Sequence, residues 1–306
     1  MEGEGEMNLK EKYIKLNDEE IFYLDNESKS EKNILMIHGN MYSSSCFIEI
    51  IKKLEDYHIF APDMRGYGKS SYNNKITSID DFVSDIKEFI LKLDIKNLTL
   101  VSWSLGGGVA LELARDKDIK DRIKNQIFLA PFGYAPFRTN GADILTNNFH
   151  EYLNNFDFIN PQKNLEIFKG LMTFNMNLIE DSFASMGMTG TELKKDNIRV
   201  LFKTFIYNVK LPEKEEFERN LESAIRQRNL DEVAGILRDY KYHGGRLEMK
   251  SLVLHGYDDK IISYMDGKFL ADEIGARFER LDDCGHSVMT DKKNLVIKNI
   301  KKFVEE

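Results

Sequence analysis

The sequence predicts an α/β fold in which a doubly wound, mostly parallel sheet of eight strands carries an inserted helical cap. Short apolar runs alternate with segments of helical periodicity, as in a parallel sheet covered by helices on both faces. The runs are continuous rather than alternating, which is typical of strands buried on both faces. This rhythm stops over residues 132–249, a stretch too long for one crossover connection, so an insertion is expected there.

The predicted elements follow from these patterns in chain order. Two runs separated by a short turn predict an opening antiparallel hairpin, and six later runs predict the remaining strands: 13–16, 20–24, 34–37, 58–61, 98–101, 126–130, 251–254 and 277–281. Apolar residues within 79–93 recur on one helical face, and Ser78 with Asp81 predicts a cap at the start of that helix. The apolar spacing within 296–303 predicts a closing helix.

These patterns divide the chain into a core, residues 1–131 and 250–306, and a helical cap, residues 132–249. The cap holds 11 of the 20 Phe residues, and four Met residues crowd into one part of it, at Met172, Met176, Met186 and Met188. Such side chains form either the core of a helical subdomain or an apolar roof over a pocket. The sequence leaves both possibilities open.

Charge and composition exclude several classes of partner. A formal net charge of -8 repels the phosphate backbone of nucleic acids and anionic lipid surfaces. No apolar run approaches the ~18 residues of a spanning helix, and the acidic start of the chain does not match a secretory signal. Two cysteines are too few for a disulfide framework. We therefore expect a cytoplasmic protein that binds neither nucleic acid nor membrane, with an oligomeric state that the sequence leaves undetermined.

The strongest local signal is the segment 98–108, where an apolar strand runs into a sharp turn and then a helix. In the turn SWSLG at 102–106, the middle residue Ser104 lies at the tip with its hydroxyl exposed, as in a nucleophile elbow. Small residues are needed on both sides because strand and helix nearly touch there. Gly106 meets that requirement and Ser102 meets it approximately. The alternative interpretation is an N-cap serine in a glycine-rich turn.

Four further motifs occur in register with this turn, and together they resemble the α/β-hydrolase superfamily. They are the strand followed by His38-Gly39-Asn40, the segment Asp63-Met64-Arg65-Gly66-Tyr67-Gly68-Lys69-Ser70, the turn His255-Gly256-Tyr257-Asp258-Asp259, and the late loop Gly285-His286. The resemblance covers roughly residues 8–131 and 250–304. Ser102 departs from the usual G-x-S-x-G pattern, and we expect it to alter packing rather than chemistry.

The resemblance implies a Ser–Asp–His triad. Ser104 would be the nucleophile, His286 the base that takes its proton, and Asp259 the acid that orients His286. Asp259 is preferred over Asp258 because it stands three residues after the glycine, as in the family.

The resemblance also implies an oxyanion hole formed by the backbone N–H groups of Asn40 and Leu105. We expect the His38 imidazole to brace its loop, and Asp63 and Arg65 to be structural.

A serine nucleophile narrows the reaction class. Haloalkane dehalogenases and epoxide hydrolases share this fold but attack an sp³ carbon with an aspartate, whereas a serine would leave an inert ether there. Acyl chemistry remains, and we favour a carboxylic ester hydrolase that forms an acyl-enzyme on Ser104 with a small or medium, largely apolar acyl substrate. A C–C bond hydrolase or thioesterase with the same triad, and a ligand receptor without turnover, are the alternatives.

No cofactor or metal is expected, because the sequence lacks metal-ligand spacing, a phosphate loop and a dinucleotide fingerprint. Cys46 and Cys284 are interpreted as small buried packing residues. Their closeness in sequence to the oxyanion loop and to His286 leaves a second hypothesis, inhibition by a bulky thiol reagent.

Overall fold

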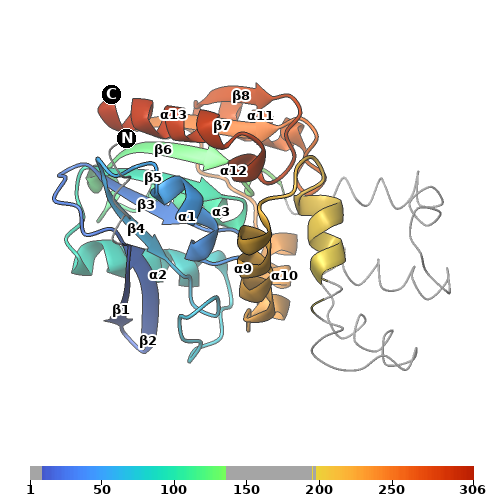
Figure 1. Ribbon diagram of the computed structural model, residues 1–306. Coiled ribbons are helices and arrows are strands. Elements are labelled where there is room, and N and C mark those ends of the chain that lie inside the picture. The colour runs from blue at the N-terminus through green and yellow to red at the C-terminus, as the bar shows by residue number, and fades with distance from the viewer. Residues whose placement is uncertain (1–8, 136–194, 196–197) are drawn as a thin grey trace, which may run out of the picture.

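The computed structural model describes residues 9–135, 195 and 198–306, which contain one eight-stranded sheet (Figure 1). The strands are β1 Lys10–Leu16, β2 Glu19–Asp25, β3 Asn33–Ile37, β4 His58–Pro62, β5 Leu98–Trp103, β6 Ile123–Leu129, β7 Lys250–Gly256 and β8 Arg277–Leu281. Their spatial order is β1-β2-β4-β3-β5-β6-β7-β8. The first two form an antiparallel hairpin, β2 pairs antiparallel with β4, and all other pairs are parallel. The predicted fold class and all eight strands are confirmed.

Two apolar clusters cover the two faces of the sheet. Because side chains alternate along a strand, Ile34 and Met36 face one cluster while Leu35 and Ile37 face the other. The first cluster contains residues of α1 (Ile48–Ile51), α12 (Val288–Asp291) and α13 (Lys293–Glu305), and the second contains residues of α2 (Ile79–Lys92), α3 (Leu105–Leu113) and α11 (Tyr264–Ile274). The sheet is thus buried on both faces, as its continuous apolar strands predict.

The helix predicted within 79–93 begins where its capping signal lies. The Ser78 side chain and that of Asp81 form a reciprocal capping box at the start of α2, which satisfies N–H groups that have no partner within the helix. The closing helix predicted within 296–303 is α13. Short 3₁₀ turns, η1 Ser44–Phe47 and η2 Lys120–Arg122, complete the connections of the core.

Within the described part of the insertion, residues 198–239 are mainly helical, and none of residues 132–135, 195 and 198–249 lies in a strand. This part comprises the π-helical turn η3 Phe202–Ile206, α9 Lys214–Ile225 and α10 Leu230–Asp239, which lie at one end of the sheet in Figure 1. Phe202, Phe217 and Leu221 join the first apolar cluster, while Val233 and Ile236 join the second. This part of the insertion therefore packs onto the core instead of forming the separate core considered above.

The four clustered Met residues lie outside the described residues. The domain boundaries at 131/132 and 249/250 stay predictions. Across the described ranges, no helix combines the length and the apolar character that crossing a bilayer would require.

Candidate active site

Ser104 lies at the junction of β5 and α3 in a strained backbone conformation. Its φ of 51° and ψ of -119° are rarely adopted by a residue with a side chain, and such strain persists only where the surroundings enforce it. Here the Ser104 N–H donates to Leu129 O at 3.1 Å, and its carbonyl accepts from the N–H of Phe132 at 3.0 Å. The hydroxyl makes no capping hydrogen bond to α3, so it does not serve as the N-cap of that helix.

Close packing around this turn explains its small residues. A Cβ atom on Gly106 would lie 2.4 Å from the carbonyl oxygen of Ile37 and 2.8 Å from that of His38, so only glycine lets α3 approach the end of β3. Ser102, which replaces the family's glycine, is buried, and its hydroxyl has no hydrogen-bond partner among the described residues. Its presence therefore costs stability, about 1 kcal/mol for one orphan hydroxyl.

Asp259 and His286 come together from the loops after β7 and β8. The His286 Nδ1–H donates to Asp259 Oδ2 at 2.8 Å, and both side chains are buried. Asp258, the neighbouring candidate, is exposed. The two loops touch at Gly256, where a Cβ atom would lie 2.3 Å from the carbonyl oxygen of Cys284. The structure thus pairs His286 with Asp259, the residue chosen by its distance from the glycine.

The Asp259 carboxylate is surrounded by donors. Its Oδ1 accepts from the N–H groups of Ile261 at 2.7 Å and Ile262 at 2.9 Å, and its Oδ2 lies 3.1 Å from His255 Nε2 as well as near His286. Burial raises the pKa of Asp259, but the charge of His286 and hydrogen bonds from His255 and His286 outweigh burial and hold the pKa below its ordinary range. The Asp259 carboxylate is therefore ionised at neutral pH.

His255 is a residue of the site that the sequence reasoning missed. Its Nε2 lies 3.0 Å from Ile262 O and 3.1 Å from Asp259 Oδ2, both of which accept hydrogen bonds, whereas its Nδ1 has no partner in the described structure. Nε2 therefore carries the proton that faces these two acceptors. His255 belongs to the motif that carries Asp259. Its contacts with Asp259 and Ile262 join the end of β7 to residues beyond the turn, and such contacts leave no periodic pattern in the sequence.

Trp103, directly before Ser104, links the histidine loop to the nucleophile elbow. Its indole N–H donates to the backbone carbonyl of His286 at 3.0 Å, and the two rings lie 5.5 Å apart between centroids. The indole is buried, so this bond is shielded from water. Trp103 was also missed, because an apolar strand residue is ordinarily interpreted as core. Its bond places His286 beside the elbow that carries Ser104.

The loop after β3 that carries His38, Gly39 and Asn40, named the oxyanion loop for its predicted role, also lies against the elbow. A Cβ atom on Gly39 would lie 3.0 Å from that of Ser104, so the loop backbone abuts the serine. In the described part of the chain, neither the N–H of Asn40 nor that of Leu105 makes a hydrogen bond. Both donors are thus available at the positions that the sequence predicts, although their role stays a prediction.

His38 braces this loop, as expected. Its Nδ1–H donates to Gly39 O at 2.8 Å, and its Nε2 accepts from the N–H of Met64 at 3.0 Å. Burial lowers the pKa of His38 to about 4, so the ring is neutral at physiological pH. The imidazole joins the oxyanion loop to the loop after β4.

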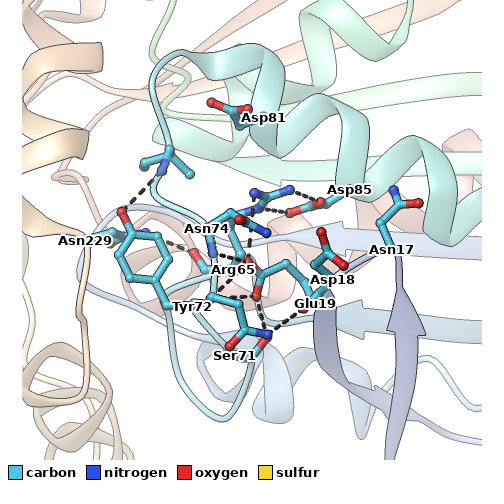
Figure 2. Close-up of polar contacts among 12 residues, drawn as sticks. Asn17, Asp18, Glu19, Arg65, Ser71, Tyr72, Asn74, Asp81, Asp85 and Asn229 are labelled. Atoms are coloured by element: carbon cyan, nitrogen blue, oxygen red, sulfur yellow. Dashed lines mark hydrogen bonds and ion pairs between the residues drawn. The ribbon is translucent and has the colours of Figure 1, made fainter.

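The loop after β4 is held by buried carboxylates, which confirms the structural interpretation of Asp63 and Arg65. Asp63 accepts hydrogen bonds from the N–H groups of Ser44 at 2.7 Å and Lys69 at 2.8 Å. Figure 2 shows the Arg65 guanidinium paired through two nitrogens with Asp85 of α2. The same loop continues into a network in which the Glu19 carboxylate accepts from backbone N–H groups that follow Ser71.

Both cysteines are free and buried, which confirms their interpretation as packing residues. Burial raises the pKa of each thiol above its ordinary value, so neither is a reactive thiolate. The described residues also contain no group of three or more His, Cys, Asp or Glu side chains that could hold a metal ion.

Residues 32–293 match the family model of the alpha/beta hydrolase fold. The chain belongs to this family. Among curated proteins, this α/β hydrolase is 34% identical to an uncharacterized protein of Mycobacterium tuberculosis over 82 residues, which are 26% of this chain and 24% of that protein. The chain thus matches only about a quarter of the length of that relative.

Solved structures match over nearly the whole chain. The esterase EaEST from Exiguobacterium antarcticum gives a TM-score of 0.71 at 18% identity, over 96% of this chain and 99% of that chain. The carboxylesterase CesB from Bacillus subtilis gives a TM-score of 0.71 at 13% identity, over 98% of this chain and 93% of that chain. At these identities the likeness shows the fold of this α/β hydrolase.

Proposed function

We propose that this α/β hydrolase is a carboxylic ester hydrolase that acts through an acyl-enzyme on Ser104. The observation that carries the proposal is the strained backbone of Ser104 at the elbow, beside the buried Asp259–His286 pair that Trp103 tethers to the same turn. A serine hydroxyl is a poor nucleophile at neutral pH and needs an adjacent, oriented base. The three side chains come from the carboxyl ends of three strands, where open α/β sheets place their sites.

The hydrogen bonds support one role for each group in this proposal. His286 donates its Nδ1–H to Asp259, so its Nε2 is the nitrogen that takes the Ser104 proton as Oγ attacks the acyl carbon. The N–H groups of Asn40 and Leu105 would stabilise the oxyanion that forms. Collapse of this intermediate expels the alcohol, which receives the proton from His286. A water molecule, activated by the same imidazole, then releases the carboxylic acid and restores Ser104.

Two observations favour an ester with a small or medium apolar acyl group. Two structural neighbours over nearly the whole chain are named as an esterase and a carboxylesterase. Aromatic side chains pack in series from Trp103 through Tyr42 to Phe202 of the insertion, with ring centroids 4.5 Å and 5.0 Å apart. These aromatic contacts next to the elbow support an apolar acyl group.

The test is turnover of a p-nitrophenyl ester series from acetate to decanoate, with a matched thioester and a 1,3-diketone, combined with fluorophosphonate labelling located by mass spectrometry. We expect label on Ser104, the highest kcat/KM on a short or medium ester, and a rate that rises with pH because only neutral imidazole accepts the proton. Turnover of the thioester or diketone alone would favour those chemistries. Labelling without any turnover would favour a receptor.

A further inference from the structure

Three hydrogen-bonded side-chain amides, those of Asn229, Gln227 and Asn40, form a series that links the core through the insertion to the oxyanion loop. It starts at the carbonyl of Arg65, which accepts from Asn229 Nδ2 at 2.9 Å, a contact visible in Figure 2. Gln227 Nε2 then donates to Asn229 Oδ1 at 2.9 Å and to Asn40 Oδ1 at 2.8 Å. Tyr67 also donates its hydroxyl to Asn40 Oδ1, at 3.0 Å. The oxyanion loop is thus bonded to the segment between α9 and α10.

The hydrogen bonds of this amide series allow only one orientation for each amide. The Arg65 carbonyl can only accept, so the Asn229 atom facing it is Nδ2 and the other is Oδ1. The Gln227 atom facing that oxygen must then be Nε2, and the Asn40 atom facing Nε2 must be Oδ1. Asn40 therefore turns its Nδ2, a donor of two hydrogen bonds, away from the amide series. No ambiguity between amide nitrogen and oxygen remains.

The position of Asn40 keeps this donor near the predicted oxyanion hole. Every other residue within 34–44 is buried, whereas Asn40 keeps exposed surface, and its Nδ2 has no partner among the described residues. The preceding residue, Gly39, abuts Ser104. An Asn Nδ2 lies roughly 3–5 Å from its own backbone nitrogen, by standard bond lengths. The free donor is thus within reach of a group next to the acyl carbonyl whose oxygen the Asn40 N–H would hold.

Among the described residues, Gln227 makes side-chain hydrogen bonds through Nε2 alone. Its Nε2 serves Asn40 and Asn229, but its Oε1 is buried without a hydrogen-bond partner among the described residues, which costs stability. An apolar side chain would avoid that cost. The bond that holds the Asn40 amide in one orientation therefore distinguishes Gln227 from a residue that only packs.

We propose that the Asn40 side chain is a specificity-determining donor beside the oxyanion hole, held by Gln227, and that it selects acyl groups with an ether or hydroxyl oxygen two bonds from the carbonyl carbon. The inference rests on the proposed esterase function and narrows its substrate to alkoxyacetyl-type or glycolyl-type esters. An oxygen at that point accepts from Nδ2, whereas a methylene in the same place leaves the donor unpaired. A site built to bond an oxygen discriminates against the analogue that lacks it.

The experiment compares p-nitrophenyl methoxyacetate with p-nitrophenyl butyrate, which differ by one oxygen in place of one methylene. In the wild type, the ratio of kcat/KM values should exceed the ratio of hydroxide-catalysed rates. Asn40→Ala should lose about five- to tenfold more kcat/KM on the methoxyacetate than on the butyrate. Gln227→Met should show the same bias, about threefold, and no further bias when combined with Asn40→Ala, because it acts only through Asn40.

Equal losses on both esters in Asn40→Ala, with an active wild type, would overturn the donor role and leave the esterase function standing. Equal losses in Gln227→Met, or a bias that adds to that of Asn40→Ala, would overturn the positioning role. Fluorophosphonate labelling of Ser104 and thermal unfolding show that each variant retains its fold and its elbow. A wild type that hydrolyses neither ester and takes no label would overturn the esterase function, and this subsite with it.

Discussion

The two sides of the candidate site are built from different parts of the chain. The acid–histidine side, Asp259 with His286 and His255, belongs to loops after β7 and β8 and is held by backbone N–H groups and buried imidazoles. The oxyanion side, Asn40 and its loop, is braced by His38 from the core but also by Gln227 from the insertion.

This difference separates the proposed charge chemistry from the proposed substrate selection. The ionised acid needs a rigid, buried environment that core loops supply, since a misplaced charge there would cost several kcal/mol. The oxyanion side touches the insertion, so changes in the insertion can alter substrate preference without moving the Asp259–His286 pair. Substitutions on the two sides should therefore have different signatures.

The largest effect is expected at Ser104, the proposed nucleophile on which both sides act. Ser104→Ala removes the attacking oxygen, so kcat on p-nitrophenyl butyrate should fall about 10⁴-fold or more, and fluorophosphonate labelling should disappear. The free energy of unfolding should change by no more than about 1 kcal/mol, because the side chain makes no capping bond. Wild-type rates in the purified variant would disprove the mechanism.

The acid–histidine side is tested by a matched pair of neighbours. Asp259→Asn should lower kcat about 10³- to 10⁴-fold, because an amide cannot hold the tautomer of His286 or stabilise the imidazolium. Asp258→Asn, at an exposed position, should stay within about twofold of wild type. Steady-state kinetics of the two proteins decide the matter, and the reverse order would mean that Asp258 is the acid.

The oxyanion side is tested through the pH dependence of stability. His38 is neutral in the fold, with a pKa lowered from 6.5 to about 4, while the unfolded chain binds a proton below about pH 6.5. Its contribution is therefore complete above that pH and is lost as pH falls toward about 4, by about 3 kcal/mol in total. Urea unfolding should show this loss in the wild type relative to His38→Gln. Parallel stability profiles would refute it.

The smallest effect is expected at His255, which acts on Asp259 rather than on substrate. His255→Asn should lower kcat about tenfold, as for one lost hydrogen bond to a charged group. The Asp259 carboxylate would then interact more strongly with His286, so the rise of kcat/KM with pH should move to higher pH. His243→Asn, at an exposed histidine, is the control and should change neither quantity. A lower kcat with an unmoved pH profile would indicate a merely structural role.

Local patterns predicted the fold and the candidate triad. Continuous apolar runs marked all eight strands, because burial on both faces of a sheet leaves that signature in the chain itself. Ser104, Asp259 and His286 stand out because each follows a strand within a glycine-containing turn, and close packing requires those glycines. The catalytic roles of these residues and the cap boundaries stay predictions.

The sequence by itself determined the sheet, the order of the motifs and the preference for Asp259 over Asp258, because these depend on spacing along the chain. Only the tertiary structure decided that His255 and Trp103 support the Asp259–His286 pair, that the insertion shares the core clusters, and that Gln227 orients Asn40. These contacts join residues up to 187 positions apart. No local period records such pairs, because they form only when the loops of separate strands and the insertion pack against one another.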